Sequence, residues 1–251
     1  MKELDFYDKV KNWDFTDIQM ESEYLTSWDM YEMLQNEATK ESRILDLGTA
    51  GGEKVLKRFP EAKEILGTDF SEEMIKTANE NLIKYGKENI SFRVMDNLNM
   101  DTPDDYYDFV VARHTVTDPK QIYKTLKEGG KLFIRGVDKL DVWELKRLFG
   151  KGQAFLDPKP ISVIDYENVL DAGFKNVELV PIHVREYYKT KDDLMALLYK
   201  TPILMDFSEV QENNDLELLI NEELIDEYIK KHSYEKGILL IRRYYGITAT
   251  K

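Results

Sequence analysis

The chain has 251 residues, of which 42% are hydrophobic and 33% are charged, and its formal net charge is -13. A chain of this length and composition can bury the core of one large domain. Its acidic excess repels duplex nucleic acid and anionic membranes. There is no cysteine, and the three histidines are far apart in the chain, so disulfides, thiolate zinc sites and a cysteine nucleophile are excluded and no metal site is expected.

The first residues, MKELDFYDKVKNWDF, are acidic and aromatic and lack the apolar core of a signal peptide. No apolar run approaches the roughly 18 residues that a membrane span requires. We therefore expect a soluble, cytoplasmic protein, and we expect residues 1–40 to form a helical lid. The aromatic residues of this segment either cover the binding site or pack on the sheet edge, and helical spacing of the last three favours packing: Trp13, Phe15, Tyr24, Trp28 and Tyr31.

Short apolar runs alternate with helical patterns over residues 41–139, which is typical of βαβ units and a parallel sheet. The predicted strands are RILDL (43–47), EILGTD (64–69), NISFRVMD (89–96), YYDFVVAR (106–113) and KLFIRGVD (131–138). The predicted helices span 51–59, 72–86 and about 119–126. Ser71 is expected to cap the second helix at its start and Gly86 to end it.

The rest of the chain is predicted to complete the same single domain. Segments 140–189 and 237–251 supply helices at 141–149 and 165–174 and strands at 175–184 and 236–249. Residues 190–236 are polar, acidic and helical in pattern. We interpret them as a helical cap inserted between the last two strands.

The turn after the first predicted strand, LGTAGGEK, does not fit a dinucleotide-binding motif. A G-x-G-x-x-G fingerprint beginning at Gly48 needs glycine at 50 and 53, where the chain has Ala50 and Glu53. A carboxylate at Glu53 would repel a pyrophosphate at the start of the helix. An NAD-dependent oxidoreductase is therefore the disfavoured alternative.

A different pattern begins at Asp46, with small residues at alternate positions: Gly48, Ala50 and Gly52. A carboxylate here favours a cationic ligand, and the small residues let that ligand lie against the backbone. Asp69 ends the second strand, where an acid can accept hydrogen bonds from ribose hydroxyls. Asp96 ends the third strand, where an acid can accept from an adenine amine. Together they indicate a nucleoside with a positively charged tail.

Five motifs in this order resemble class I S-adenosylmethionine-dependent methyltransferases: ILDLGTAGG, GTDFSEEMIKTAN, FRVMDNL, YDFVVARHTV and TLKEGGKLFI. The resemblance covers roughly residues 40–138. It implies an α/β fold with a Rossmann-like, seven-stranded mixed sheet flanked by helices and an antiparallel last strand. It also implies S-adenosyl-L-methionine as cofactor and S-adenosyl-L-homocysteine as product.

By this resemblance the glycine turn lies under the methionine and ribose parts of the cofactor, Asp69 holds the ribose and Phe70 lies against the adenine. Asp96 takes the exocyclic amine, and Asn97 offers its backbone to the ring. The resembling family more often has glycine at the position of Ala50. This difference puts the resemblance in little doubt, because a methyl group is the smallest side chain that can be added. The full set of expected cofactor residues is Asp46, Gly48, Thr49, Ala50, Gly52, Asp69, Phe70, Asp96, Asn97 and Arg113.

Three residues are candidates for the acceptor side. His114 follows the fourth strand and could remove a proton, because imidazole titrates near neutral pH; a structural or solvent-facing histidine is an equal alternative. Arg113 and Arg135 end neighbouring strands and could bind a carboxylate or phosphate of the substrate. The more ordinary outcome is that each arginine pairs with an acid such as Asp118 or Asp138.

Strand four ends in ARHTV and not in the N-P-P-Y type of motif that resembling families use for base nitrogens. We therefore predict methyl transfer to an oxygen or nitrogen of a small-molecule acceptor. An RNA methyltransferase and a non-catalytic S-adenosylmethionine-binding protein are the alternatives. The acceptor and the oligomeric state stay open.

Overall fold

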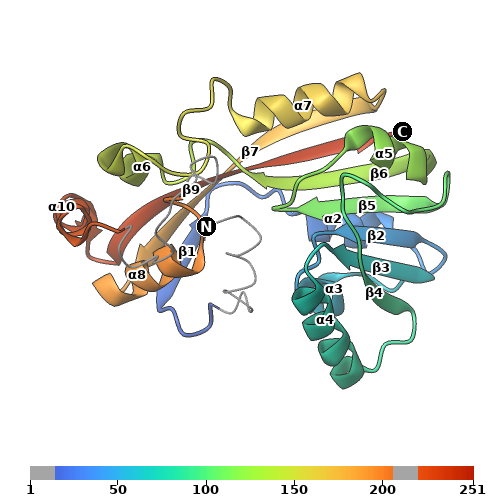
Figure 1. Ribbon diagram of the computed structural model, residues 1–251, viewed down its shortest axis with the longest axis horizontal. Helices are drawn as coiled ribbons and strands as arrows, with labels where there is room; N and C mark the ends of the chain where they lie inside the picture. The colour runs from blue at the N-terminus through green and yellow to red at the C-terminus, as the bar shows by residue number, and fades with distance from the viewer. Residues whose placement is uncertain (1–14, 206–219) are drawn as a thin grey trace. The chain divides into compact units, whose positions relative to one another are not determined.

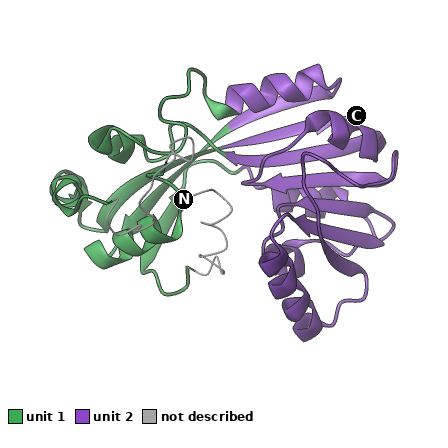
Figure 2. Cartoon of the chain, viewed as in Figure 1, with its two compact units in different colours: residues 1–27, 137–161, 181–244 green, residues 28–136, 162–180, 245–251 purple. Residues whose placement is uncertain are grey.

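The structure is a computed structural model that describes residues 15–205 and 220–251. It has two compact units, each made of three segments (Figure 2). Unit 1 comprises Met1–Ser27, Val137–Ile161 and Pro181–Tyr244, and unit 2 comprises Trp28–Gly136, Ser162–Val180 and Tyr245–Lys251. Organisation as a single domain stays a prediction, and Trp13 lies outside the described residues.

Unit 2 contains the parallel strands that the sequence predicts (Figure 1). They are β2 (Arg43–Leu47), β3 (Glu64–Asp69), β4 (Ile90–Val94), β5 (Tyr107–Arg113) and β6 (Leu126–Val137). β2 pairs in parallel with β3 and β5, β3 with β4, and β5 with β6. Nearly continuous apolar runs explain this pairing, because both faces of such a sheet are covered.

The helices of this part of the chain are α2 (Met30–Glu37), α3 (Glu53–Arg58), α4 (Glu72–Tyr85), α5 (Pro119–Thr125) and α7 (Ile161–Asp171). Buried side chains of α2, α3 and α4 form one core cluster with side chains of the parallel strands. As predicted, Ser71 caps α4 by accepting a hydrogen bond from the Met74 N–H, and Gly86 ends it in the left-handed conformation.

Two long strands, β7 (Lys175–Tyr188) and β9 (Gly237–Thr250), continue the sheet. Backbone hydrogen bonds join Gly130 to Lys251 and Asp138 to Arg243, so β9 runs antiparallel to β6. The predicted antiparallel last strand is confirmed. The strand order over the described residues is β1-β7-β9-β6-β5-β2-β3-β4, with β8 (Ser233–Tyr234) beside β9. The mixed α/β class is confirmed, but the predicted count of seven strands is wrong, because β1 and β8 raise it to nine in this part of the chain.

Strand β1 (Met20–Tyr24) corrects the prediction of a wholly helical segment 1–40. It pairs antiparallel with β7, from Met20 opposite Tyr188 to Tyr24 opposite Val184. Tyr24 therefore lies in a strand and Tyr31 in helix α2, so the helical spacing assumed for the aromatic residues does not exist. Tyr31 is buried in the core, as the packing alternative expected.

Unit 1 carries α6 (Trp143–Phe149), α8 (Lys191–Lys200) and α10 (Glu222–His232). The last two lie in the predicted helical segment 190–236, whose residues 206–219 fall outside the described part. The Thr190 hydroxyl and the Asp193 carboxylate cap the start of α8 reciprocally. Leucine and isoleucine side chains of α8, α10 and β9 share a second core cluster.

Arg242 and Arg243 of β9 both form ion pairs. The Arg242 guanidinium donates to the Asp141 carboxylate at 3.0 Å and to Glu186 Oε2 at 3.3 Å, and it is buried. Arg243 Nη2 donates to Glu144 Oε1 at 2.8 Å. Adjacent residues of a strand face opposite sides of the sheet, so the guanidinium groups of the two arginines pair with different acids.

None of the helices in the described ranges is long and apolar enough to cross a membrane.

Candidate functional site

The carboxyl ends of β2, β3, β4 and β5 lie at one edge of the sheet, because these strands are parallel. The predicted site residues follow them in turn. Asp46 and the glycine turn come at the end of β2, Asp69 ends β3, Asp96 follows β4 and Arg113 ends β5. The fold therefore brings the predicted cofactor residues to one edge.

The glycine turn has a backbone that favours residues without a large side chain. Gly48 and Gly52 both have φ of +75°, and Ala50 has φ of +49°. The N–H groups of Gly48 and Thr49 both donate to the Thr68 carbonyl at 2.8 Å. A Cβ at Gly48 would stand 2.7 Å from Cβ of Thr115, so no side chain fits there. The turn leaves open backbone at the sheet edge.

Asp69 joins strand β3 to the glycine turn. Its Oδ2 accepts the Ala50 N–H at 2.9 Å and its Oδ1 accepts the Ser71 N–H at 3.1 Å. The residue is 9% exposed. Burial raises the pKa of its carboxyl, and the N–H groups of Ser71 and Ala50 oppose that rise. Each carboxylate oxygen still has a lone pair with which to accept a ligand hydroxyl.

Asp46 is 6% exposed. Burial raises the pKa of its carboxyl to about 7, against the lowering effects of the Thr49 hydroxyl and the Arg113 charge. A buried carboxyl with so high a pKa gains by meeting a cation, because the cation favours its charged form.

Asp96 and Asn97 differ in their surroundings. Asp96 is exposed, and the Leu98 N–H and the Asn99 amide donate to its carboxylate at 2.8 and 2.6 Å and hold its pKa below the ordinary value. Asn97 is buried, and its amide nitrogen donates to Thr115 Oγ1 at 3.0 Å. The Asn97 Oδ1 has no hydrogen-bond partner in the described part of the chain. It is thus a buried acceptor whose hydrogen-bonding capacity is unused within the described residues.

Large apolar side chains are exposed close to the same strand ends. Phe70 follows β3 and is 46% exposed, and Val94 ends β4 and is 48% exposed. Leu98 and Val116 follow β4 and β5 and are also exposed. Exposed apolar groups beside polar acceptors are typical of ligand sites.

Ala50 holds its backbone in the left-handed region, where a Cβ is strained. We expect Ala50→Gly to raise the free energy of unfolding by about 0.5–1 kcal/mol, because relief of strain exceeds the added chain entropy. Urea denaturation measures the change. Ala112→Gly, in β5 and outside the positive-φ residues, is the control and should lower stability. A loss of stability in Ala50→Gly would contradict the strain.

Arg113 and Arg135 are Cα partners across β5 and β6, as expected for neighbouring strands. The expected pairing of Arg113 with Asp118 does not form: Asp118 caps α5 instead, accepting from the Lys120 and Gln121 N–H groups. His114 is exposed with φ of +55°, and its N–H donates to the Arg135 carbonyl at 2.8 Å. A left-handed backbone is uncommon for residues other than glycine, so the chain holds His114 at the sheet edge under conformational constraint.

Glu53 begins α3 and lies against the turn. Its Oε1 is 2.6 Å from where a Cβ of Gly51 would be. This carboxylate supports the argument against a pyrophosphate, because an anion here would meet another anion.

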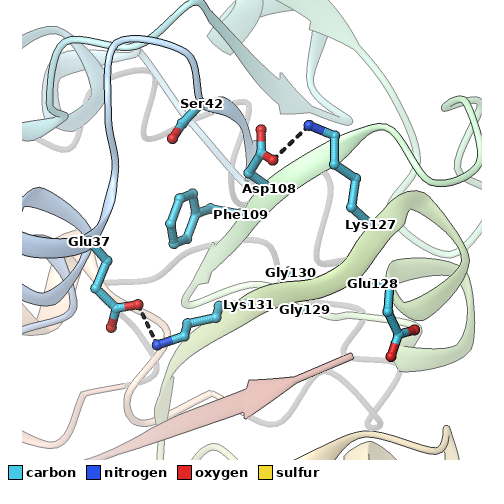
Figure 3. Close-up of a pocket in the computed structure, with 9 residues that line it drawn as sticks. All are labelled: Glu37, Ser42, Asp108, Phe109, Lys127, Glu128, Gly129, Gly130 and Lys131. Carbon is cyan, nitrogen blue, oxygen red and sulfur yellow. Dashed lines mark hydrogen bonds and ion pairs between the residues drawn. The ribbon is translucent and has the colours of Figure 1, made fainter.

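A cavity of about 300 Å³ lies at the amino ends of β5 and β6, the opposite edge of the sheet (Figure 3). Both of its lysines pair with acids of the same lining: Lys127 with Asp108 at 2.6 Å, and Lys131 with Glu37. Because both lysines are already neutralised, this pocket is a weaker candidate for the ligand site than the sheet edge at the carboxyl ends of the strands. In residues 15–205 and 220–251, no group of three His, Cys, Asp or Glu side chains is arranged to hold a metal ion.

Two residues of this edge are absent from the sequence-based prediction. Thr115 contacts Gly48 and Asn97, and Lys54 lies on α3 immediately after the turn. A threonine after a strand and a lysine in a helix carry no distinctive pattern. Only the packing of separate chain segments reveals their positions.

The comparisons with known proteins agree with this geometry. The family described as "Methyltransferase domain" matches residues 38–196, more than half of the chain. The uncharacterized methyltransferase YcgJ of Bacillus subtilis is 28% identical over 96 residues, and the match spans 38% of each chain. The crystal structure of YcgJ aligns with a TM-score of 0.54 at 20% identity and covers 88% of this chain and 96% of YcgJ.

A second solved structure is phosphoethanolamine N-methyltransferase 2 of Haemonchus contortus in complex with S-adenosyl-L-methionine. It aligns with a TM-score of 0.52 at 17% identity, covering 99% of this chain and 56% of that one. At such identities the structures show a shared fold. Together with the family match, they confirm that the chain belongs to the class I S-adenosylmethionine-dependent methyltransferase family that its motifs predict.

Proposed function

We propose that this methyltransferase binds S-adenosyl-L-methionine at the carboxyl edge of β2–β5 and methylates an oxygen or nitrogen of a small-molecule acceptor. Asp46 and the glycine turn would lie along the methionine and ribose parts, and Asp69 would hold the ribose. Phe70, Asp96 and Asn97 would surround the adenine.

The observation that carries this proposal is the position of Asp69. Its carboxylate fixes the glycine turn through the Ala50 N–H and retains lone pairs at the same edge. A ribose diol can donate two hydrogen bonds to one carboxylate, so a single residue both shapes the turn and receives the ligand.

Two further features fit the cofactor. Asn97 has a buried Oδ1 without a protein partner in the described residues, which suits a ligand donor because an unsatisfied buried acceptor is costly. Gly48 has no space for a Cβ on the side of Thr115, so the turn presents no side chain at this position. The residues present therefore suit a nucleoside with a cationic tail.

The cofactor supplies a sulfonium methyl that the acceptor's lone pair displaces in line. The protein's own part is to hold the acceptor in that line and to exclude water, which accounts for much of the rate in such transfers. His114 would accept the proton that the acceptor releases, because neutral imidazole is available near pH 7. Arg113 and Arg135 would orient the acceptor.

Isothermal titration calorimetry with S-adenosylhomocysteine tests the proposal. We expect Asp69→Ala to weaken binding by about 10- to 100-fold, because hydrogen bonds to a charged group contribute about 1.5–3 kcal/mol. Asp101→Ala is the matched control, since its side chain is 99% exposed, and it should bind as the wild type does.

NAD serves as the competing ligand in the same titrations. Binding of NAD without S-adenosylhomocysteine would overturn the proposal. If S-adenosylmethionine binds but no small molecule or RNA acceptor yields S-adenosylhomocysteine, the non-catalytic alternative is favoured over the enzyme. The net charge of -13 favours the small molecule over RNA.

A further inference from the structure

Two arginines lie on one face of the parallel sheet. Along β5, Phe109 and Val111 belong to the core cluster under α2 and α3, and Arg113 is the next residue on that face. Along β6, Phe133 belongs to the same cluster and Arg135 is next. The core therefore ends in two guanidinium groups at the carboxyl edge.

Other polar groups converge on the same place. Asp46 follows Ile44 on this face of β2, and Tyr31 lies on the covering helix α2. Lys54 extends from α3. Burial, followed by the charge of Arg113, lowers the pKa of Lys54. Burial raises the pKa of Tyr31 to about 12, and the charge of Arg113 opposes that rise. We call Lys54, Arg113 and Arg135 the cation cluster.

Within this cluster, Lys54 and Arg113 bring more positive charge than the described residues around them neutralise. Arg58, in the last turn of α3, is paired with Asp29 at 3.0 Å. Lys54 and Arg113 have no carboxylate within 4.0 Å in the part of the chain that the structure describes. Asp46 is the acid of this group, and with a pKa of about 7 it is only partly charged at neutral pH. Like charges held together with too little opposing charge repel one another, so an anion would stabilise them.

We propose that the cation cluster binds an oxyanion, a carboxylate or phosphate, that the methyl acceptor carries. This inference rests on the proposed function and adds the substrate class to it. The amino-acid end of the cofactor is a zwitterion with no net charge, so it leaves the excess positive charge of the cluster in place. An anionic group on the acceptor neutralises that excess and fixes the acceptor beside His114. Guanidinium groups suit this task because they bind oxyanions in a fork.

The test uses inorganic phosphate as the probe. Phosphate is titrated calorimetrically, at low ionic strength, into the full chain saturated with S-adenosylhomocysteine. Lys54→Gln and Arg135→Gln should each weaken phosphate binding about tenfold or more, as expected for loss of a charge-assisted bond. The control, Lys76→Gln, removes the same charge from the exposed surface of α4 and should leave phosphate affinity unchanged.

Each variant is also titrated with S-adenosylhomocysteine and with methylthioadenosine, which lacks the amino-acid end. Equal phosphate affinity in Lys54→Gln and Lys76→Gln would overturn the inference. Weaker S-adenosylhomocysteine binding with unchanged methylthioadenosine binding would also overturn it, because the cluster would then hold the cofactor's own carboxylate. Lack of S-adenosylhomocysteine binding by the wild type overturns the proposed function instead, and phosphate titrated into the ligand-free chain still tests the cluster.

Discussion

Replacing Arg242 by methionine is expected to lower the free energy of unfolding by about 3–5 kcal/mol. The side chains of Asp141 and Glu186 are 1% and 9% exposed, and both lie within 3.3 Å of the Arg242 guanidinium. Without that charge, two carboxylates stay buried in unit 1 and lose the ion pairs that offset their lost hydration. Urea denaturation followed by circular dichroism measures the loss.

Arg243→Met provides the comparison in the adjacent residue. Arg243 pairs with Glu144, whose side chain is 33% exposed. An ion pair in contact with water contributes about 1 kcal/mol or less, so this variant should lose much less stability. Equal losses in the two variants would show that burial of the Asp141, Arg242 and Glu186 group is not what stabilises unit 1.

Asp46→Asn is expected to make the protein more stable at alkaline pH while weakening cofactor binding. The folded-state pKa of Asp46 is about 7, against an ordinary value of 3.8. As pH rises from 4 to 7, the unfolded chain releases this proton and the folded chain retains it, so the wild type loses stability. A tenfold difference in proton affinity between the folded and unfolded chain corresponds to about 1.4 kcal/mol, which predicts a loss of about 2–3 kcal/mol between pH 5 and pH 8.

Asparagine does not titrate, so Asp46→Asn should lack this loss and should exceed the wild type in stability at pH 8. Urea denaturation at both pH values measures it, and Asp101→Asn, at an exposed site, should follow the wild type. Parallel pH dependence in Asp46→Asn and the wild type would show that Asp46 titrates normally. Cofactor binding is measured on the same samples, because a stability gain with lost affinity identifies Asp46 as a binding residue.

The parallel strands of unit 2 could be predicted because each is an apolar run bounded by turn residues. RILDL and EILGTD match β2 and β3 residue for residue. β1 could not be predicted. Its sequence, MESEY, is mostly exposed and lacks apolar alternation, and it is a strand because β7, far along the chain, supplies its hydrogen bonds.

The acids at the strand ends could also be predicted, because each stands at the end of a predicted strand in the sequence. The spacing of residues in the sequence does not reveal which of them form hydrogen bonds. It could not predict that Asp69 accepts from the Ala50 N–H or that Asn97 donates to Thr115. Two of the three members of the cation cluster, Arg113 and Arg135, were predicted from the sequence. Lys54 joins it because α3 packs on the same face of the sheet, and that depends on tertiary packing.

The alternation of segments between the two units bears on how the protein is made. Unit 2 begins at Trp28 but is completed by Tyr245–Lys251, whose final residue donates its N–H to the Gly130 carbonyl. At synthesis rates of about 5–20 residues per second, the ribosome needs roughly 10–40 seconds to cover that distance. In the later part of this time, from the synthesis of Val137 until that of β9, the edge of β6 that β9 will cover stays open, which exposes the nascent chain to aggregation through that edge.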